Sequence, residues 1–333
     1  MRGVEFIAFI IFLMRSASGW SFGSWILPKV DSYNPYCFVK ECCNKDWINF
    51  DREMLSKNLK GRVYGQPLVN NVVNALAAHF SPHYEPRKAL TISFHGWTGG
   101  GKNYVANFIA ESIFRKGAKS KYVHQFIGRL HFSEEAKVEH YKHNLVQWIK
   151  GNVTYCPQQL FIFDEVDKMI PDVLNAIKPM IDHRDNIEGI DYRQCIFIFL
   201  SNTGAQLINE HYLDMYKEGR NREELALGDF DDYIKRGAFN EKGGFFQNDN
   251  IKSDLIDHYI PFLPLEERHI RLCIKDEFVL RRVLNPSAQH IDAVLKIVQW
   301  GPEGTKLFSK TGCKRIGAQV GLLTEQYYRK NEL

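Results

Sequence analysis

The sequence predicts an α/β protein with a parallel five-stranded sheet flanked by helices, followed by a small C-terminal α-helical domain. One observation is that short apolar, β-prone runs alternate with segments in which apolar residues recur at helical spacing, as in parallel strands joined by helices. A second is that Leu160 to Phe163 are apolar without interruption, as a strand buried on both faces requires. A third is the mostly helical pattern from Glu266 onward. The predicted strands cover residues 90–94, 122–130, 160–163, 195–200 and 259–265.

Length and composition are those of an ordinary globular protein. At 333 residues the chain can form one large domain or two moderate ones. It contains 44% hydrophobic and 25% charged residues, which is typical of globular proteins. A net charge of +4 is too small to indicate nucleic acid, and we expect no such partner.

The N-terminus has the pattern of a signal peptide, which we place at residues 1–19. Arg2 supplies a weakly basic start, Phe6 to Met14 form an apolar run, and Ser16 to Gly19 supply small residues for cleavage. The apolar run is too short to span a bilayer. A membrane anchor or a buried helix is the alternative interpretation.

Three further features agree with the secretory pathway. Asn152-Val153-Thr154 is a glycosylation sequon, and we place it in a loop with Cys156 after a helix over 134–150. Seven cysteines suit an oxidising compartment. The chain ends Lys-Asn-Glu-Leu, close to the Lys-Asp-Glu-Leu retrieval signal. Together these features predict a resident of the endoplasmic reticulum lumen.

The first strand leads into a glycine-rich loop and then into an amphipathic helix, which is the context that a phosphate-binding loop requires. Backbone N–H groups of such a loop surround phosphate oxygens, and the helix N-terminus adds partial positive charge. Lys102 is predicted to reach the β- and γ-phosphates of a bound nucleotide. Asn103 stands where Ser or Thr usually meets Mg²⁺, and its amide oxygen can still face the metal. The loop comprises Gly96, Trp97, Thr98, Gly99, Gly100, Gly101, Lys102 and Asn103.

Upstream, residues 62–66 end in Gly65-Gln66, before a helix from Pro67 to Phe80. In P-loop ATPases a Gly-Gln corner of this sort often helps to hold adenine. A plain turn before the helix is an equally good interpretation of so short a motif.

Two carboxylates follow the third strand, at the strand end where open α/β sheets bind ligands. Asp164 is predicted to hold Mg²⁺, and Glu165 to polarise the attacking water. An acidic pair at a helix N-terminus is the alternative. Asp167 and Lys168 are interpreted as a solvated helix face. Asn202 follows the fourth strand and can orient water, although Asn is also common in turns.

The segment from 205 to 250 is polar and carries three arginines, one of which could serve a neighbouring subunit as an arginine finger. Surface arginines are the alternative interpretation; the three are Arg220, Arg222 and Arg236. Prolines near the end of the last strand predict a domain boundary there. Further on, Gly312-Cys313-Lys314 could bring a cation to the phosphates.

The order of these motifs resembles that of the AAA+ ATPases, and their details resemble the torsins. The resemblance runs from about Cys37 to Arg315 and depends on the stretches 96–103, 161–169, 197–202, 261–266 and 312–314. It implies a large α/β nucleotide-binding domain over 37–265 and a small helical lid over 266–333. It also implies an ATPase of the endoplasmic reticulum lumen and the perinuclear space, related to Clp-type unfoldases.

The resemblance assigns roles residue by residue. It places Lys102 on the phosphates, Asp164 on Mg²⁺ and Glu165 in hydrolysis, with Asn202 as sensor 1 and Lys314 as sensor 2. It implies a structural disulfide between Cys37 and Cys156. A second disulfide, between Cys273 and Cys313, would lie beside the nucleotide and couple redox state to ATP binding. Cys195, within a predicted strand, is expected to be an inert core thiol.

Torsins lack an arginine finger of their own and borrow one from membrane-anchored activators with AAA+-like luminal domains. We therefore expect such an activator as partner, with a homo-oligomer and peripheral membrane contact as further associations. The leading hypothesis is an ATPase that remodels protein or membrane complexes at the endoplasmic reticulum and nuclear envelope. The alternative is a nucleotide-gated binding module with negligible hydrolysis. A threading unfoldase ranks last, because residues 131–140 contain no aromatic-glycine pair.

Overall fold

The computed structural model describes residues 37, 39–248, 251 and 254–331. The predicted signal peptide lies outside these residues, as do the last two residues of the retrieval-like tail. From Glu41 onward the chain forms one compact unit. None of the helices in the described ranges is both long and apolar enough to cross a membrane.

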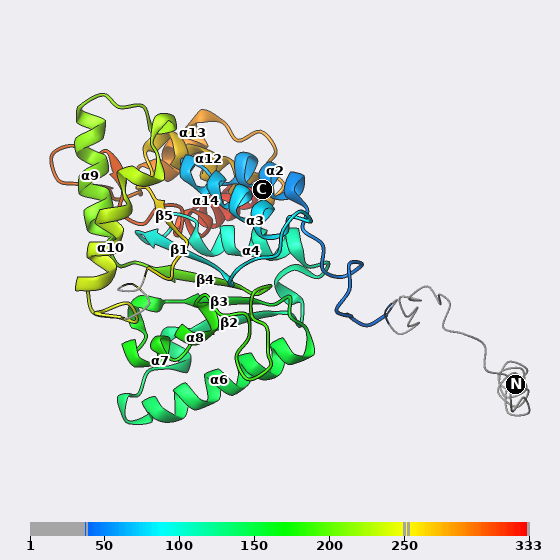
Figure 1. The fold of residues 1–333 in the computed structure, drawn as a ribbon. Helices are drawn as coiled ribbons and strands as arrows, with labels where there is room; N and C mark the ends of the chain where they lie inside the picture. The colour runs from blue at the N-terminus through cyan, green and yellow to red at the C-terminus, as the bar shows by residue number, and fades with distance from the viewer. Residues whose placement is uncertain (1–36, 38, 249–250, 252–253, 332–333) are drawn as a thin grey trace, which may run out of the picture. The chain divides into compact units, whose positions relative to one another are not determined.

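The predicted five-stranded parallel sheet is confirmed (Figure 1). Its strand order is β2-β3-β4-β1-β5, so that β1 lies between β4 and β5. Every residue of β1 is buried, as a central parallel strand requires. The strands are β1 (Leu90–Gly96), β2 (Val123–Ile127), β3 (Leu160–Asp164), β4 (Ile196–Ser201) and β5 (His258–Phe262).

Alternation along β3 and β4 gives the sheet two different faces. The phenylalanines of the two strands point to one face, where Phe161 stacks on Phe197 at 5.0 Å between ring centroids. The aliphatic residues between them, such as Ile162 and Ile198, point to the other. Each face buries its own core, and a fully buried Phe or Ile contributes about 1.5–3 kcal/mol.

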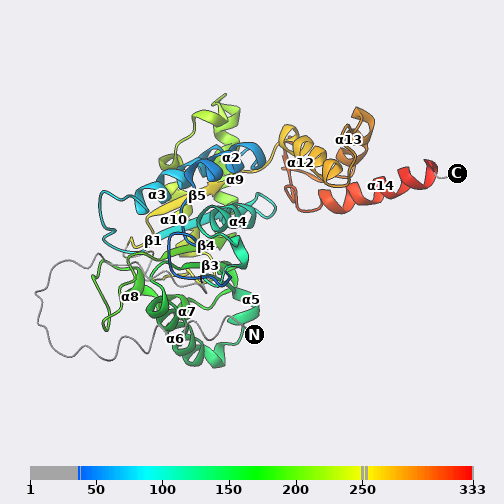
Figure 2. The same ribbon diagram turned by 90° about the vertical axis from the view of Figure 1, so that its right-hand side faces the viewer.

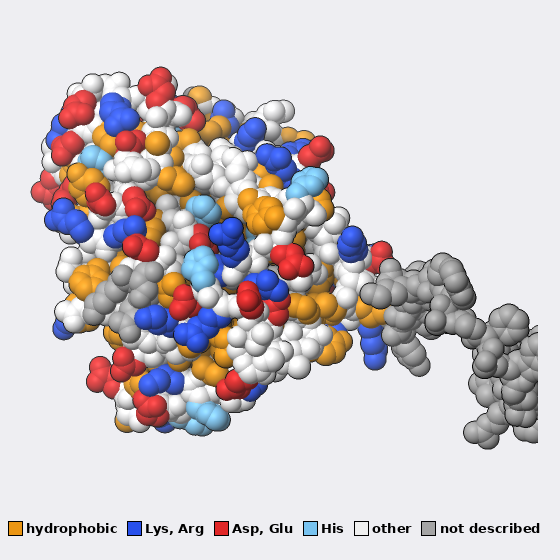
Figure 3. Space-filling view, in the orientation of Figure 1, with side chains coloured by type: hydrophobic (Ala, Val, Ile, Leu, Met, Phe, Trp, Pro, Cys, Tyr) orange, Lys and Arg blue, Asp and Glu red, His pale blue; other side chains and the backbone are white. Residues whose placement is uncertain are grey.

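The two faces are covered by different helices. The aliphatic face packs against α2 (Arg52–Arg62), α3 (Asn71–His79) and α4 (Lys102–Ile113). The aromatic face packs against α6 (Val138–Tyr155), α7 (Pro171–Asn175), α8 (Lys178–Ile181), α9 (Ala205–Lys217) and α10 (Asp231–Asn240). Of these, α6, α7 and α8 lie below the strands in Figure 1. A single turn, α5 (Gly128–His131), follows β2. On the face seen in Figure 3, acidic and basic side chains are interspersed.

The helices after β5 pack around a separate apolar core that includes Ile270, Ile274 and Val294. We call this part of the chain, from Glu266 onward, the lid. Figure 2 shows its helices grouped side by side. They are α12 (Glu267–Leu280), α13 (Ala288–Leu295) and α14 (Ile316–Asn331), and the short strands β6 (Trp300–Gly301) and β7 (Phe308–Ser309) form a hairpin between α13 and α14.

Several predicted boundaries are wrong. The second strand ends at Ile127 rather than at residue 130. The last ends at Phe262 rather than at 265, because the side chain of Gln66 takes both backbone groups of Leu263. Helix α6 continues to Tyr155, so the sequon lies in its last turn and not in a loop. There the Asn152 side chain donates to the Trp148 carbonyl at 2.8 Å.

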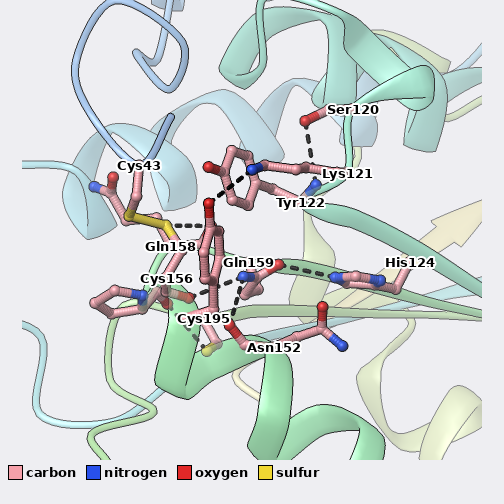
Figure 4. The surroundings of a disulfide bond; sticks show 12 residues. Cys43, Ser120, Lys121, Tyr122, His124, Asn152, Cys156, Gln158, Gln159 and Cys195 are labelled. Atoms are coloured by element: carbon pink, nitrogen blue, oxygen red, sulfur yellow. Dashed lines mark hydrogen bonds between the residues drawn. A yellow bond between two sulfur atoms is a disulfide. The ribbon is translucent and has the colours of Figure 1, made fainter. Parts of the chain in front are cut away.

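The predicted Cys37–Cys156 disulfide is also wrong, because Cys156 is bonded to Cys43 (Figure 4). Cys156 ends α6 with its N–H on the Asn152 carbonyl. Glu41 accepts a hydrogen bond from the Lys121 N–H, which holds the segment before Cys43. Cys37 and Cys42 are themselves disulfide-bonded. Cysteines at 37, 42 and 43 are too close in sequence for spacing to select a partner.

Two other expectations for cysteines are confirmed. Cys273 and Cys313 form a disulfide that joins α12 to the loop before α14. Cys195 is a free thiol buried beside Cys156 (Figure 4), and burial raises its pKa. A thiol held in the protonated form is a poor nucleophile, so Cys195 is an inert core residue.

Candidate nucleotide-binding site

The glycine-rich loop joins the end of β1 to the start of α4, at the edge of the sheet where β3 and β4 also end. Two of its glycines have no room for a side chain. A Cβ on Gly96 would lie 2.4 Å from the Phe262 carbonyl oxygen, and one on Gly99 would lie 2.0 Å from the Thr311 carbonyl oxygen. The first N–H groups of α4 have no partner within the helix. The loop therefore offers a backbone cradle for phosphate.

The Lys102 ammonium lies across this loop. Its Nζ donates to the carbonyls of Gly96 and Trp97, at 2.5 and 3.1 Å, and to Asn202 Oδ1 at 3.0 Å. Burial lowers the pKa of Lys102 to about 8, against the opposing effect of Asp167 and Asp164. The predicted phosphate-binding lysine and the predicted sensor 1 are thus in direct contact.

The two predicted metal ligands are also in contact. Asn103 Nδ2 donates to Asp164 Oδ2 at 2.9 Å, and Asp164 Oδ1 accepts from the Glu165 N–H at 2.8 Å. Mg²⁺ is bound by oxygen and usually takes only one or two protein ligands besides phosphate and water. Asp164 and Asn103 each carry a side-chain oxygen of the kind that Mg²⁺ prefers, although it is the Asn103 amide nitrogen that faces the carboxylate in this structure.

Glu165 directly follows β3 in a left-handed backbone conformation, with φ of 52°. Non-glycine residues adopt this region rarely and at an energetic cost, often at functional sites. The Glu165 side chain is 38% exposed, and its nearest cation is Arg129, 4.0 Å away. It therefore borders the cavity with its carboxylate accessible.

The interpretation of Asp167 as part of a solvated face is wrong. Its side chain is 9% exposed, and its Oδ1 accepts from the backbone N–H and the amide of Asn202, at 3.2 and 3.3 Å. Asp167 lies in the 3₁₀ turn Val166–Lys168, which directs it back toward the end of β4. The sequence signal that could have indicated this position is the spacing: Asp167 follows Asp164 by three residues, and in a turn rather than a helix such a residue can face the same strand ends. Lys168 pairs with Asp167 at 3.1 Å from a half-exposed position.

The lid closes the other side of a cavity of about 540 Å³. The Cys313 N–H donates to the Gly99 carbonyl at 3.1 Å, and the Trp97 indole donates to the Lys310 carbonyl at 2.8 Å. The cavity is lined by Lys314 and the Cys273–Cys313 disulfide on the lid, and by Lys102, Asn103, Asp164, Glu165 and Asn202 opposite. All the residues to which catalytic or metal-binding roles were assigned thus border one cavity.

Gly65 lies in a turn before the helical segment from Pro67, as one of the two interpretations predicts, and Gln66 adds contacts of its own. Gln66 is buried, and its amide donates to the carbonyls of Leu263 and Gly100, at 2.9 and 3.3 Å. It ties the phosphate loop to the end of β5. The residues before the corner line the cavity instead: Arg62, Val63 and Tyr64.

None of the three arginines considered as a finger lines this cavity. Arg222 is buried, so neither of the two interpretations applies to it. Arg220 pairs with Asp229 at 3.4 Å, and Arg236 is exposed.

The sheet topology and this arrangement of residues place the protein in the class that has an AAA+ P-loop fold. Two structures of Hsp104 share it. Hsp104 of S. cerevisiae in complex with ADP superposes with a TM-score of 0.54 at 19% identity, over 90% of this chain and 50% of that one. A closed-state cryo-EM reconstruction of Hsp104 with ATPγS and casein gives 0.55 at 18% identity, over 84% and 48%. The chain spans about half the length of these Hsp104 chains.

Sequence comparison identifies the family. The torsin family model matches residues 37–163. A torsin-like protein of Caenorhabditis elegans is 39% identical over 290 residues, which are 86% of this chain and 81% of that protein. The chain belongs to the torsin family.

Proposed function

We propose that the chain is an ATPase of the endoplasmic reticulum lumen and perinuclear space that remodels protein or membrane complexes. The observation that carries this proposal is the convergence of Lys102, Asn103, Asp164, Glu165 and Asn202 on one cavity. Torsin family membership and the AAA+ fold support an ATPase-type enzyme. The disulfides support an oxidising compartment.

In this proposal the chain acts mainly by positioning and charge. Lys102 and the loop N–H groups hold the β- and γ-phosphates. Asp164 and Asn103 would hold Mg²⁺, which supplies positive charge to the phosphates when bound. Glu165 takes the proton of the attacking water. Asn202 orients that water and is itself oriented by Asp167. Lys314 approaches the phosphates from the lid, and the boundary at 265/266 separates it from the large domain.

A partner is proposed to complete the site. Of the arginines considered as a finger, none lines the cavity, and a membrane-anchored activator with an AAA+-like luminal domain would supply one. Ring formation with further copies, peripheral membrane contact and glycosylation at Asn152 belong to the same proposal. Because the sequon is helical in the folded chain, the glycan would be added before α6 forms.

The decisive experiment measures ATP turnover with and without a cognate luminal activator. We expect the activator to raise turnover of the wild type, and Glu165→Gln to lower activated turnover by about 10²-fold or more, the usual size of a general-base contribution. Glu218→Gln, at an exposed position after α9, is the matched control and should behave as wild type. Activation of neither protein, or of wild type and Glu165→Gln equally, would contradict the mechanism.

A nucleotide-gated binding module is the second candidate. Two observations favour it: Asn103 stands in place of a hydroxyl, and none of the three arginines considered as a finger lines the cavity. Here Glu165→Gln and wild type would release a bound partner alike on addition of ATP. An ATPase cycle predicts instead that Glu165→Gln retains the partner complex that wild type releases.

A further inference from the structure

Arg222 lies outside the cavity and yet contacts three segments that form it. It sits in a 3₁₀ turn (Arg222–Glu224) after α9, and its side chain is 1% exposed. Nε donates to the Gly65 carbonyl at 2.7 Å, and Nη1 donates to the Pro264 carbonyl at 3.0 Å and to Glu266 Oε1 at 2.9 Å. A buried cation with these partners is costly to leave unpaired. The guanidinium is therefore held in one place.

The three acceptors belong to segments whose relative positions determine the shape of the nucleotide cavity. Gly65 ends the segment whose residues 62–64 line the nucleotide cavity. Pro264 lies where the chain leaves β5 for the lid. Glu266 is the residue immediately before α12, the first lid helix. A single side chain thus connects a cavity wall, the segment between β5 and α12, and the lid.

Neighbouring contacts make this junction tight. Glu266 also accepts from the Tyr212 hydroxyl at 2.9 Å and pairs with Arg268 at 3.0 Å. The Arg222 guanidinium lies over the Tyr212 ring, 4.8 Å from its centroid. Gly65 packs so closely on the lid that an added Cβ would lie 2.8 Å from the ring of His269. A change in lid angle would have to break several of these contacts together.

We propose that Arg222 is a positioning residue that sets the angle of the lid, and so the approach of Lys314 to the bound nucleotide. This inference rests on the proposed ATPase function. Arginine suits this position, because a planar guanidinium can donate from Nε and Nη1 in different directions at once, whereas lysine is a flexible point charge. Arg222→Lys should therefore behave more like Arg222→Met than like the wild type.

The first test measures amide hydrogen exchange in the nucleotide-free protein. We expect Arg222→Met to raise exchange at least tenfold at the first amides of α12 and in residues 62–66, with β1 to β4 unchanged. Arg220→Met is the matched control, since it removes an exposed arginine two residues away. Unchanged exchange at both places would overturn the proposal, whether or not the protein binds ATP. If Arg222→Met does not fold, Tyr212→Phe weakens the same junction by one hydrogen bond and is judged by the same criterion.

The second test is a double-mutant cycle on ATP affinity between Arg222→Met and Lys314→Ala. If Arg222 acts by placing Lys314, its replacement should weaken ATP binding at least fivefold in the wild type and less than twofold in the Lys314→Ala background. Equal losses in both backgrounds would reduce Arg222 to a structural residue and overturn the proposal. Absence of ATP binding by the wild type would refute the proposed function instead, and hydrogen exchange would then decide the role of Arg222.

Discussion

At the scale of the residue, Asp167 and Asn202 act as a pair across two strand ends. Asp167 has little exposure, and it receives the backbone N–H and the side-chain amide of Asn202. Hydrogen bonds to a charged acceptor are worth about 1.5–3 kcal/mol. Asn202 in turn accepts from Lys102. The amide that would orient water is therefore fixed on both sides.

Replacing the carboxylate should loosen Asn202 and slow hydrolysis. We expect Asp167→Ala to lower activated turnover about tenfold, equivalent to about 1.4 kcal/mol, with a smaller change in ATP affinity. Asp172→Ala, an exposed acidic residue in the first turn of α7, serves as control. Normal turnover of Asp167→Ala at saturating ATP would show that Asn202 needs no such support.

His95 is a second residue to consider, because its surroundings determine its protonation state. It is fully buried in β1, with Nε2 2.7 Å from Ser93 Oγ and Nδ1 3.0 Å from the Thr203 carbonyl. Burial lowers its pKa to about 4, and the nearby Lys102 acts in the same direction. Between the ordinary histidine pKa of about 6.5 and about 4, the unfolded chain binds the proton and the folded chain does not.

Stability should therefore be complete above about pH 6.5 and should fall as the pH drops toward 4. At pH 5 this one group accounts for a loss of about 2 kcal/mol, since one pKa unit equals about 1.4 kcal/mol. We expect His95→Gln, which cannot take up this proton, to lose correspondingly less stability between pH 7 and pH 5. Urea unfolding at the two pH values measures this, and identical pH dependence in both proteins would contradict the assignment.

At the scale of the element, the phosphate loop and the lid meet through backbone at Gly99, beside the side-chain contact of Trp97 with Lys310. Gly99 has φ of 77°, and the Thr311 carbonyl occupies the space of its missing Cβ. Gly189 has nearly the same φ, 82°, but nothing lies within 4 Å of its Cβ position. Comparing substitutions at the two glycines therefore distinguishes the cost of backbone strain, which both share, from the cost of a steric clash, which only Gly99 has.

We expect Gly99→Ala to force the lid away from the loop and to weaken ATP binding at least tenfold. Gly189→Ala should destabilise the fold by about 1–3 kcal/mol through strain alone and leave ATP affinity unchanged. Calorimetric titration with ATP and denaturant unfolding report the two quantities separately. An equal effect of both substitutions on affinity would show that the contact between Gly99 and Thr311 is not needed for nucleotide binding.

At the scale of the whole molecule, local sequence patterns were enough to predict the strands of the main sheet. The features that could not be predicted depend on contacts between segments that are distant in sequence. The strands could be predicted because a run such as Leu160 to Phe163 is apolar on both faces. The β6–β7 hairpin could not, because each strand has two residues. The contact of Arg222 with Gly65 joins residues 157 positions apart, and no repeating pattern in the sequence indicates it. The choice of Cys43 over Cys37 likewise depends on how residues 41–43 pack against β2 and α6.

The disulfides Cys43–Cys156 and Cys273–Cys313 lie in different parts of the molecule, so their effects on stability and on nucleotide binding can be tested separately. Cys43–Cys156 joins the segment before α2 to the end of α6, across 113 positions. Cys273–Cys313 lies in the wall of the nucleotide cavity, next to Lys314. Loss of a native disulfide commonly costs about 2–5 kcal/mol of stability. Only the second bond, however, holds the loop that contacts Gly99.

Reduction should therefore act on nucleotide binding through one disulfide only. Opening Cys273–Cys313 frees the lid loop from α12, so Lys314 is no longer held against the cavity. We expect ATP affinity to fall at least threefold in reduced protein, and Cys313→Ser to show the same loss without reductant. Cys43→Ser should lower the free energy of unfolding but leave the ATP affinity of the folded protein unchanged. Titrations with ATP under oxidising and reducing conditions, on wild type and both variants, measure this. Equal affinities in oxidised and reduced wild type, with Cys313→Ser also unchanged, would mean that the lid loop keeps its place without the covalent link.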